Sequence, residues 1–278
     1  MDRILRGVIK YRQTVQAELV KQFEKIRDNP KPTALMFTCM DSRMLPTRFT
    51  QASVGEIFVV RNAGNLIPDA PHYGMGSEVS VTTEPAALEL AVKRGKVNHI
   101  IVCGHSDCKA MNALHALHSC PLHFDHSSPM DQWLRKNGHR TMKRLNERLF
   151  RGALPLAFTS EVAPSQSFEA IIAPFDRLAV EDKLSQINVL QQMMNIASHD
   201  TLKESFESMW FDVYKGEDYL FSKETKQFTI IKVGREERGE KGKLQEETVG
   251  RLMEELNGRC GVPMGENDSI REASFSPG

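Results

Sequence analysis

The stretch from Thr33 to Arg43, TALMFTCMDSR, begins as an almost purely apolar run and ends in polar and charged residues. Its apolar part, Thr33–Cys39, follows two closely spaced prolines. A short apolar run bounded in this way is typical of a strand that is buried on both faces of a parallel sheet. Two further runs of the same kind are Glu56–Arg61 and His99–Gly104 (HIIVCG). These three segments form the predicted centre of the fold.

Predicted helices alternate with these strands. A helix from Thr83 to Gly95 leads directly into the third run, which is the order of a parallel crossover. We therefore predict an α/β fold whose sheet is parallel over residues 33–118, with right-handed connections. The remaining predicted elements are helices at Arg12–Arg27, Leu178–Phe206 and Leu244–Leu256, strands at Met209–Tyr214 and Gln227–Val233, and a surface loop at His115–Pro129. In the helix Leu178–Phe206, one apolar stripe is expected to pack on the core; its residues are Leu184, Ile187, Leu190 and Met194.

The length and composition favour one large domain. The 278 residues can bury a substantial core, and we expect a single domain over 1–235 that includes an N-terminal helical arm at 1–28. A helix and a mobile tail are expected at 236–278. Lys and Arg number 36, as do Asp and Glu, so no net charge draws the chain to nucleic acid or to an anionic membrane. No apolar run approaches the ~18 residues that a membrane span needs.

The N-terminus and the cysteines indicate an intracellular protein. The first residues lack the apolar core and the cleavage site of a secretory signal. They are basic and amphipathic, which keeps a mitochondrial address open beside the cytosol, although Asp2, Glu18 and Glu24 argue against a cleaved transit peptide. Five cysteines, an odd number in a reducing compartment, favour metal binding or catalysis over a disulfide framework.

Three metal-binding residue types follow two of the predicted strands. Cys39 ends the first strand, and His105 and Cys108 follow the third. Ligands bind beyond the carboxyl ends of the strands in open parallel sheets, so we expect these three side chains to converge there. Two thiolates and one imidazole select zinc, and three protein ligands leave a fourth position for water. The sequence therefore predicts a catalytic zinc site.

Asp41 and Arg43 supply charged groups beside this site. Two thiolates cancel the formal charge of zinc, so a neighbouring acceptor is needed to hold the hydroxide that forms from its water. Asp41 is placed for that role, and Arg43 can keep the carboxylate ionised and oriented. Asp41 could instead occupy the fourth metal position when water is absent. The pair is thus a candidate switch.

Other interpretations of these residues have weaker support. A thiol-dependent hydrolase of the phosphatase kind needs an arginine six positions after its cysteine, and position 45 is leucine. A non-catalytic zinc scaffold needs a fourth protein ligand or a broken Asp–Arg pair, and neither is evident. Cys103 shares a strand face with His105, yet core packing explains it better. Asp107 and Lys109 are interpreted as solvated residues at the start of a helix.

Three motifs, CMDSR at Cys39–Arg43, RNAGN at Arg61–Asn65 and CGHSDC at Cys103–Cys108, together resemble the β-class carbonic anhydrases, particularly their invertebrate animal branch. The resemblance implies a zinc enzyme that reversibly hydrates carbon dioxide to bicarbonate and a proton, with zinc hydroxide as the nucleophile. It also implies four parallel strands plus one antiparallel edge strand, flanked by helices. A homodimer or homotetramer is implied as well, in which the N-terminal helix embraces the partner.

The resemblance also assigns roles to individual residues. Zinc would lie on Cys39, His105 and Cys108. Asp41 and Arg43 would form a catalytic dyad that orients the hydroxide or gates the metal. The remaining assignments are a substrate pocket lined by Phe58, Arg61, Asn62, Ala63 and Gly64, and a proton relay through His72, Tyr73 or a chain of water molecules.

The sequence departs from the family pattern at three places. A Gly-x-Leu-x-x-His-Gly-like stretch usually precedes the segment that begins at Met209, and its absence here predicts a truncated antiparallel strand. Leu90 stands where relatives often carry tyrosine. Met36 replaces the tryptophan that accompanies an allosteric bicarbonate site in some bacterial members, so we predict no such regulatory site.

Overall fold

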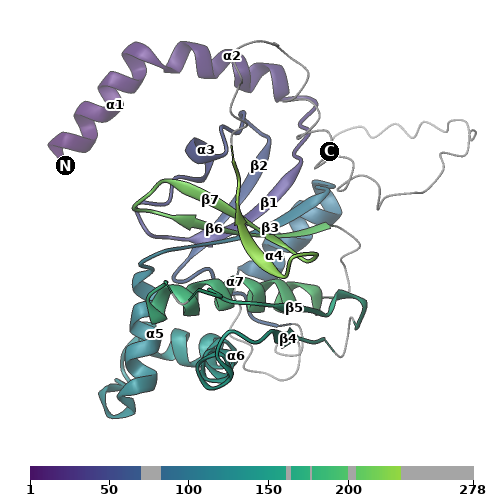
Figure 1. Cartoon of the computed structure of the whole chain (residues 1–278). Helices are drawn as coiled ribbons and strands as arrows, with labels where there is room; N and C mark the ends of the chain where they lie inside the picture. The colour runs from purple at the N-terminus through teal and green to yellow at the C-terminus, as the bar shows by residue number, and fades with distance from the viewer. Residues whose placement is uncertain (70–82, 161–163, 176, 200–204, 233–278) are drawn as a thin grey trace, which may run out of the picture. The chain divides into compact units, whose positions relative to one another are not determined.

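The computed structural model describes residues 1–69, 83–160, 164–175, 177–199 and 205–232. Six strands form one sheet in the order β2-β1-β3-β6-β7-β8 (Figure 1). The first four are mutually parallel, and β7 and β8 extend the sheet by antiparallel pairing. Their bounds are β1 Ala34–Cys39, β2 Ile57–Asn62, β3 His99–His105, β6 Ser205–Asp212, β7 Glu217–Ser222 and β8 Gln227–Ile230; a separate antiparallel pair consists of β4 Leu156–Phe158 and β5 Phe168–Ala170.

This sheet confirms the predicted α/β fold with four parallel strands, and it carries two antiparallel strands at the edge where one was expected. β7 lies where the sequence predicted only turn residues, because the hairpin with β6 supplies its backbone partners. The prediction of a truncated antiparallel strand at Met209 is wrong. β6 begins at Ser205 and pairs with β3 from His99↔Ser205 to His105↔Phe211, so it is the fourth parallel strand rather than an antiparallel one.

The predicted N-terminal helix is two helices. The chain breaks helical geometry at Val15, whose φ is −121°, and therefore α1 ends before it and α2 begins after it. α5 also runs as far as Ser119, into the segment that was predicted to be a surface loop. The helices are α1 Asp2–Thr14, α2 Gln16–Ile26, α3 Pro46–Phe49, α4 Glu84–Leu88 with its π-helical continuation Glu89–Arg94, α5 Lys109–Ser119, the 3₁₀ turn η3 Pro121–His123, α6 Pro129–Arg151, the 3₁₀ turn η4 Pro164–Gln166 and α7 Val180–Ala197.

α6 occupies a segment for which the sequence analysis made no prediction. Local signals nevertheless define both of its ends. Pro129 stands at the first helical position, and the Ser128 hydroxyl accepts a hydrogen bond from the backbone N–H of Asp131 at 3.2 Å. Gly152 ends the helix with a φ of 66°. α6 packs against α5 and α7, and the three helices lie together beside the sheet (Figure 1).

α7 is the central helix of the core. The sequence predicted one apolar stripe, but the helix is buried all the way round from Lys183 to Ile196, because it lies between strands β3 and β6 and helices α5 and α6. Its polar side chains bond to the loop after β2: Asn188 Nδ2 donates to the carbonyl of Gly64 at 2.9 Å, and Asn195 Nδ2 donates to that of Ile67 at 2.7 Å. The buried amides thereby fix the loop that borders the site.

The structure describes the N-terminal helices but not the residues after 232. Residues Met1–Ile231 form one compact unit. The predicted helix Leu244–Leu256 and the tail lie outside the described residues, and the domain boundary near 235 stays a prediction. No residue of α1 or α2 is buried. Of the helices that are described, none combines the length and the apolarity needed to cross a membrane.

Candidate metal centre

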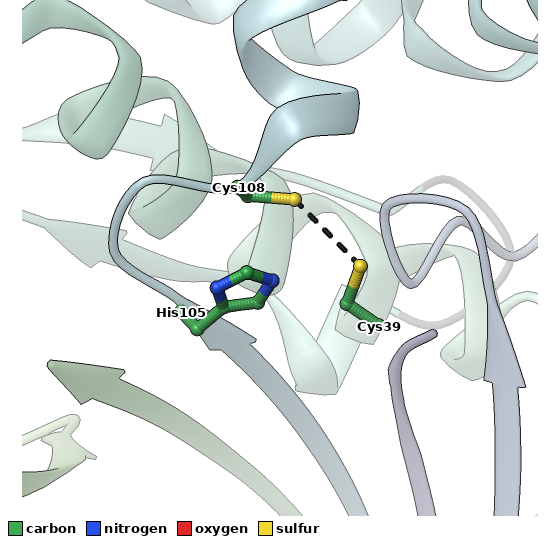
Figure 2. Close-up of side chains that lie close together, drawn as sticks. All are labelled: Cys39, His105 and Cys108. Atoms are coloured by element: carbon green, nitrogen blue, oxygen red, sulfur yellow. Dashed lines mark hydrogen bonds between the residues drawn. The ribbon is translucent and has the colours of Figure 1, made fainter. Parts of the chain in front are cut away.

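The sheet brings Cys39, His105 and Cys108 together as predicted. β1 and β3 are parallel neighbours, so Cys39 at the end of the first lies beside His105 at the end of the second. Cys108 is the N-cap residue of α5, directly before the first helical residue. The three side chains are buried, and their ligand atoms all lie within 4.8 Å of one another. Figure 2 shows the two sulfurs, 3.8 Å apart, facing each other beside the His105 ring.

The His105 ring has one bonded and one unbonded nitrogen. Nδ1 lies 2.8 Å from the carbonyl oxygen of Ser106, and because a carbonyl can only accept, Nδ1 carries the proton. Nε2 therefore presents a lone pair. This buried atom has no hydrogen-bond partner among the described residues. A buried acceptor atom without a hydrogen-bond partner, next to two thiols, is the arrangement expected of a residue that coordinates a metal ion.

The two cysteines are electrostatically coupled. The hydrogen bond from the Cys108 thiol is the largest cause that lowers the pKa of Cys39, and the His105 side chain lowers it further. The same sulfur pair, together with burial, raises the pKa of Cys108. Without a cation the pair thus shares one proton, because two adjacent thiolates repel each other in a buried site. A divalent cation would remove that obstacle. The set of two sulfurs and one imidazole nitrogen fits zinc.

Asp41 and Arg43 lie beside this cluster as a closed pair. Asp41 Oδ1 accepts from the backbone N and the Nε of Arg43, both at 2.9 Å, and Oδ2 accepts from Nη2 at 2.7 Å. The Arg43 side-chain hydrogen bonds are the main cause that lowers the pKa of Asp41 to about 2. The carboxylate is therefore ionised and fixed in orientation at neutral pH.

Asp107 is a third charged residue bonded to the Asp41–Arg43 pair, and the sequence analysis did not assign it to the site. It was interpreted as a solvated residue at a helix start, but its Oδ2 accepts from Arg43 Nη1 at 2.8 Å and from the Tyr214 hydroxyl at 2.7 Å. Its Oδ1 accepts from Lys109 Nζ at 2.7 Å. The bonds from Lys109, Tyr214 and Arg43, in that order, hold the pKa of Asp107 well below its usual range. Asp107 also has a φ of 49°, a left-handed backbone conformation that is uncommon for residues other than glycine.

The sequence analysis missed both Asp107 and Tyr214 as residues of the site, but only Asp107 had a signal in the sequence. Asp107 lies between two predicted ligands, so its position in the chain could have marked it as part of the site. Tyr214 offered no such signal. It lies in the turn between β6 and β7, and only the pairing of β6 with β3 brings it to Asp107.

The end of β2 and the loop after it lie beside the centre. Arg61 Nη2 donates to the carbonyl of Asp41 at 2.7 Å, and its Nε donates to that of Cys39 at 3.2 Å. Asn62 Nδ2 donates to Glu84 Oε1 at 2.8 Å, and the carbonyl of Ala63 accepts from Trp133 Nε1 at 2.9 Å. Gly64 has a φ of 81°, where a Cβ atom would lie 2.8 Å from the Cε of Met111. Arg61 thus holds the backbone on both sides of Met40, from Cys39 to Asp41.

Other predicted residues lie elsewhere. Phe58 is four residues before Asn62 in β2, opposite Leu35, and packs into the apolar cluster around Leu35 rather than at the strand end. His72 and Tyr73 lie outside the described residues. Cys103 is buried in a core cluster with Met36 and Met44, as predicted, and burial raises its pKa.

Comparisons with known proteins agree with this geometry. Residues 34–216 match the family model for carbonic anhydrase. The chain is 64% identical over 270 residues to Beta carbonic anhydrase 1 of Caenorhabditis elegans, with 95% of each chain covered, and 61% identical over the same length and coverage to that of Caenorhabditis briggsae. The solved structure of the β-carbonic anhydrase CcaA matches with a TM-score of 0.64 and 26% identity, covering 84% of this chain and 92% of that one. A solved structure from work on two tetrameric β-carbonic anhydrases of Sordaria macrospora shares the fold at a TM-score of 0.53 and 19% identity, covering 80% of this chain and 93% of that one.

Proposed function

The chain belongs to the β-class carbonic anhydrases, and from this premise we propose that it reversibly hydrates carbon dioxide to bicarbonate and a proton at a zinc ion held by Cys39, His105 and Cys108. The observation that carries the proposal is the unbonded Nε2 of buried His105 beside the two cysteine sulfurs. When bound, zinc supplies a Lewis acid that lowers the pKa of its water toward neutrality.

The role we propose for Asp41 is to orient the attacking oxygen. A carboxylate that stays ionised can accept a hydrogen bond from that oxygen and point its lone pair at the substrate carbon. Arg43 keeps Asp41 ionised through three hydrogen bonds, and Asp107 holds Arg43 from the other side. Both carboxylate oxygens of Asp41 face Arg43, which favours orientation over occupation of the metal. Gating would require Asp41 to leave these bonds.

The pocket and the proton path complete the proposal. Arg61 and Asn62 end β2, and Ala63 and Gly64 follow them in the loop. Arg61 bonds to the carbonyls of Cys39 and Asp41, which supports the assignment of this segment to the pocket wall. Phe58 stays in the proposal on the family resemblance. So do His72 and Tyr73, as the groups that would pass the proton to buffer.

A homodimer or homotetramer is part of the proposed function. Its support in the chain is the exposed apolar surface of α1, where Ile4, Leu5, Val8 and Ile9 are 48–64% exposed. A helix with such a surface is more stable against a partner than in water. Cytosol and mitochondrion both remain in the proposal. Imaging of the full chain carrying a C-terminal fluorescent tag distinguishes the two compartments.

Stopped-flow hydration of carbon dioxide, on protein whose zinc content is measured, tests the activity. We expect hydration that depends on zinc and is lost when the metal is removed by a chelator. Protein that binds one zinc per chain but gives no hydration between pH 7 and pH 9 would show a zinc scaffold instead. Protein that binds no zinc would overturn the metal assignment itself.

A further inference from the structure

A cavity of about 420 Å³ lies between α5, η3 and α6. Its floor is apolar and is formed by Leu114 and Leu117 of α5 and by Met142 of α6. Leu114 and Leu117 are six and nine residues along the chain from Cys108, which places them about 9 and 13 Å from it along the helix axis. Neither Cys39, His105 nor Cys108 lines the cavity. The volume falls within the range of sites for small organic ligands. The cavity is therefore separate from the centre that binds carbon dioxide in the proposed function.

The rim of the cavity is basic. Arg135, His139 and Lys143 stand at intervals of four residues on α6, so they lie along one face of the helix, and all three are exposed. His118 of α5 stands on the opposite side. No Asp or Glu lines the cavity, and no ion pair to Arg135 or Lys143 is found in the described parts of the chain. The positive charge at the rim is thus not neutralised from within the fold.

Two of the rim groups are held in place. The guanidinium carbon of Arg135 lies 4.0 Å from the centre of the Phe124 ring, an arrangement that orients the planar group while leaving its N–H donors available. Asn146 Nδ2 lies 3.1 Å from His118 Nε2 across the cavity mouth. A fixed guanidinium fork above an apolar floor matches a ligand with a carboxylate at one end and an apolar body at the other.

We propose that this cavity binds a small organic carboxylate with an apolar body. The carboxylate lies at the rim between Arg135 and Lys143, and the apolar body lies on Leu114, Leu117 and Met142. Bicarbonate lacks an apolar body and would leave the floor uncovered, so the ligand differs in class from the substrate of the proposed function. The site does not depend on zinc.

Calorimetric titration of the zinc-loaded full chain with 2-naphthoate and its neutral analogue 2-naphthamide tests the inference. We expect one naphthoate per chain, bound at least about tenfold more tightly than the amide, because only the carboxylate makes charge-assisted bonds at the rim. The double variant Arg135→Gln/Lys143→Gln should lose about tenfold in naphthoate affinity. Equal affinity for the two compounds, or no binding at all, would overturn the proposal.

Controls separate this cavity from the metal centre. Lys136→Gln removes one positive charge from the same helix at a residue that does not line the cavity, and it should bind naphthoate as the unmodified protein does. Leu117→Phe fills the floor without changing charge and should weaken binding. Because none of these residues touches the metal centre, all variants should hydrate carbon dioxide at the unmodified rate. Naphthoate binding of unchanged affinity in the double variant would show that the rim does not hold the carboxylate and would refute the site, whatever the outcome for hydration.

Discussion

The hydroxyl of Tyr214 donates a hydrogen bond to Oδ2 of Asp107 at 2.7 Å, and these two residues are 107 positions apart in the chain. The same carboxylate oxygen accepts from Arg43 Nη1 at 2.8 Å. Arg43 in turn holds both oxygens of Asp41. Tyr214 in the β6–β7 turn is therefore connected, through the Asp107 carboxylate and the Arg43 guanidinium, to Asp41, the residue proposed to orient the attacking oxygen.

Replacement of Tyr214 by Phe tests that connection. The variant keeps the ring and removes one donor to Asp107, so Arg43 should be held less firmly, and we expect kcat to fall about three- to tenfold with zinc still bound. Tyr219→Phe is the matched control, because its hydroxyl donates at 2.8 Å to Glu217 on the same hairpin, away from the dyad. Equal hydration rates in both variants, measured by stopped flow, would show that Tyr214 has no positioning role.

Replacement of Asp41 by Asn tests the dyad itself. Zinc should remain bound, since none of the three ligands changes, while turnover should fall by at least about tenfold because the amide cannot act as an ionised acceptor. Hydration rate and zinc stoichiometry are measured on the same preparation. Full activity of the zinc-loaded variant would refute the orienting role.

The Asp41–Arg43 pair should also make stability depend on pH. Since the folded-state pKa of Asp41 is lowered to about 2, its ionised form stabilises the fold above the unfolded-state pKa near 3.8, and this contribution is lost as the pH falls through the folded-state value. The unmodified metal-free protein should exceed Asp41→Asn in free energy of unfolding by up to about 2 kcal/mol at pH 7.

Urea unfolding at several pH values checks this dependence. The difference between the two proteins should shrink between pH 4 and pH 2. Metal-free samples are used because protonation of the cysteine ligands would otherwise add a second acid-dependent loss. A difference that stays constant over this pH interval would show that the pair contributes no ionisation-linked stability.

Zinc binding should release protons from the cysteine pair. In the absence of the cation Cys39 and Cys108 share one proton, and both must be thiolates to bind the metal. At pH 7 we expect release of about one proton per zinc, measured by calorimetry in buffers of different ionisation enthalpy. Cys108→Ser should weaken zinc binding, because one of the two proposed thiolate ligands is lost. Uptake of zinc by the unmodified protein without proton release would contradict the shared-proton state.

Gly64→Ala should destabilise the loop that borders the centre. The residue has a φ of 81°, and an added Cβ would lie 2.8 Å from Met111 Cε and 3.1 Å from Ala110 Cβ. We expect a loss of about 2–3 kcal/mol in the free energy of unfolding, from backbone strain and crowding together. Gly152→Ala provides the control, because its φ is 66° but nothing lies within 4 Å of the added atom. Similar losses in both variants, measured by urea unfolding, would show that Met111 gives way without cost.

Local patterns predicted part of the fold well. All six residues of β1 are buried, as the uninterrupted apolar run predicted. A strand that is covered on both faces reads as a nearly continuous apolar run, so its sequence alone reveals it. β7 has the sequence EDYLFS, whose polar start conceals a strand that exists because β6 and β8 flank it. α7 was predicted to have one buried stripe, but helices α5 and α6 cover its remaining face, and its own sequence does not reveal that neighbours lie on both sides.

The sequence by itself identified the three residues that we propose to bind the metal, and the Asp41–Arg43 pair. Their types and short spacings fix the chemistry, and each motif lies within a few residues of a strand end. Only the tertiary structure decided that Asp107 bonds to Arg43 and that Tyr214 bonds to Asp107. The basic cavity likewise exists only because α5 packs against α6. These features join side chains that are distant in the chain. Their contacts follow from strand register and helix packing, which depend on the whole fold rather than on any local pattern.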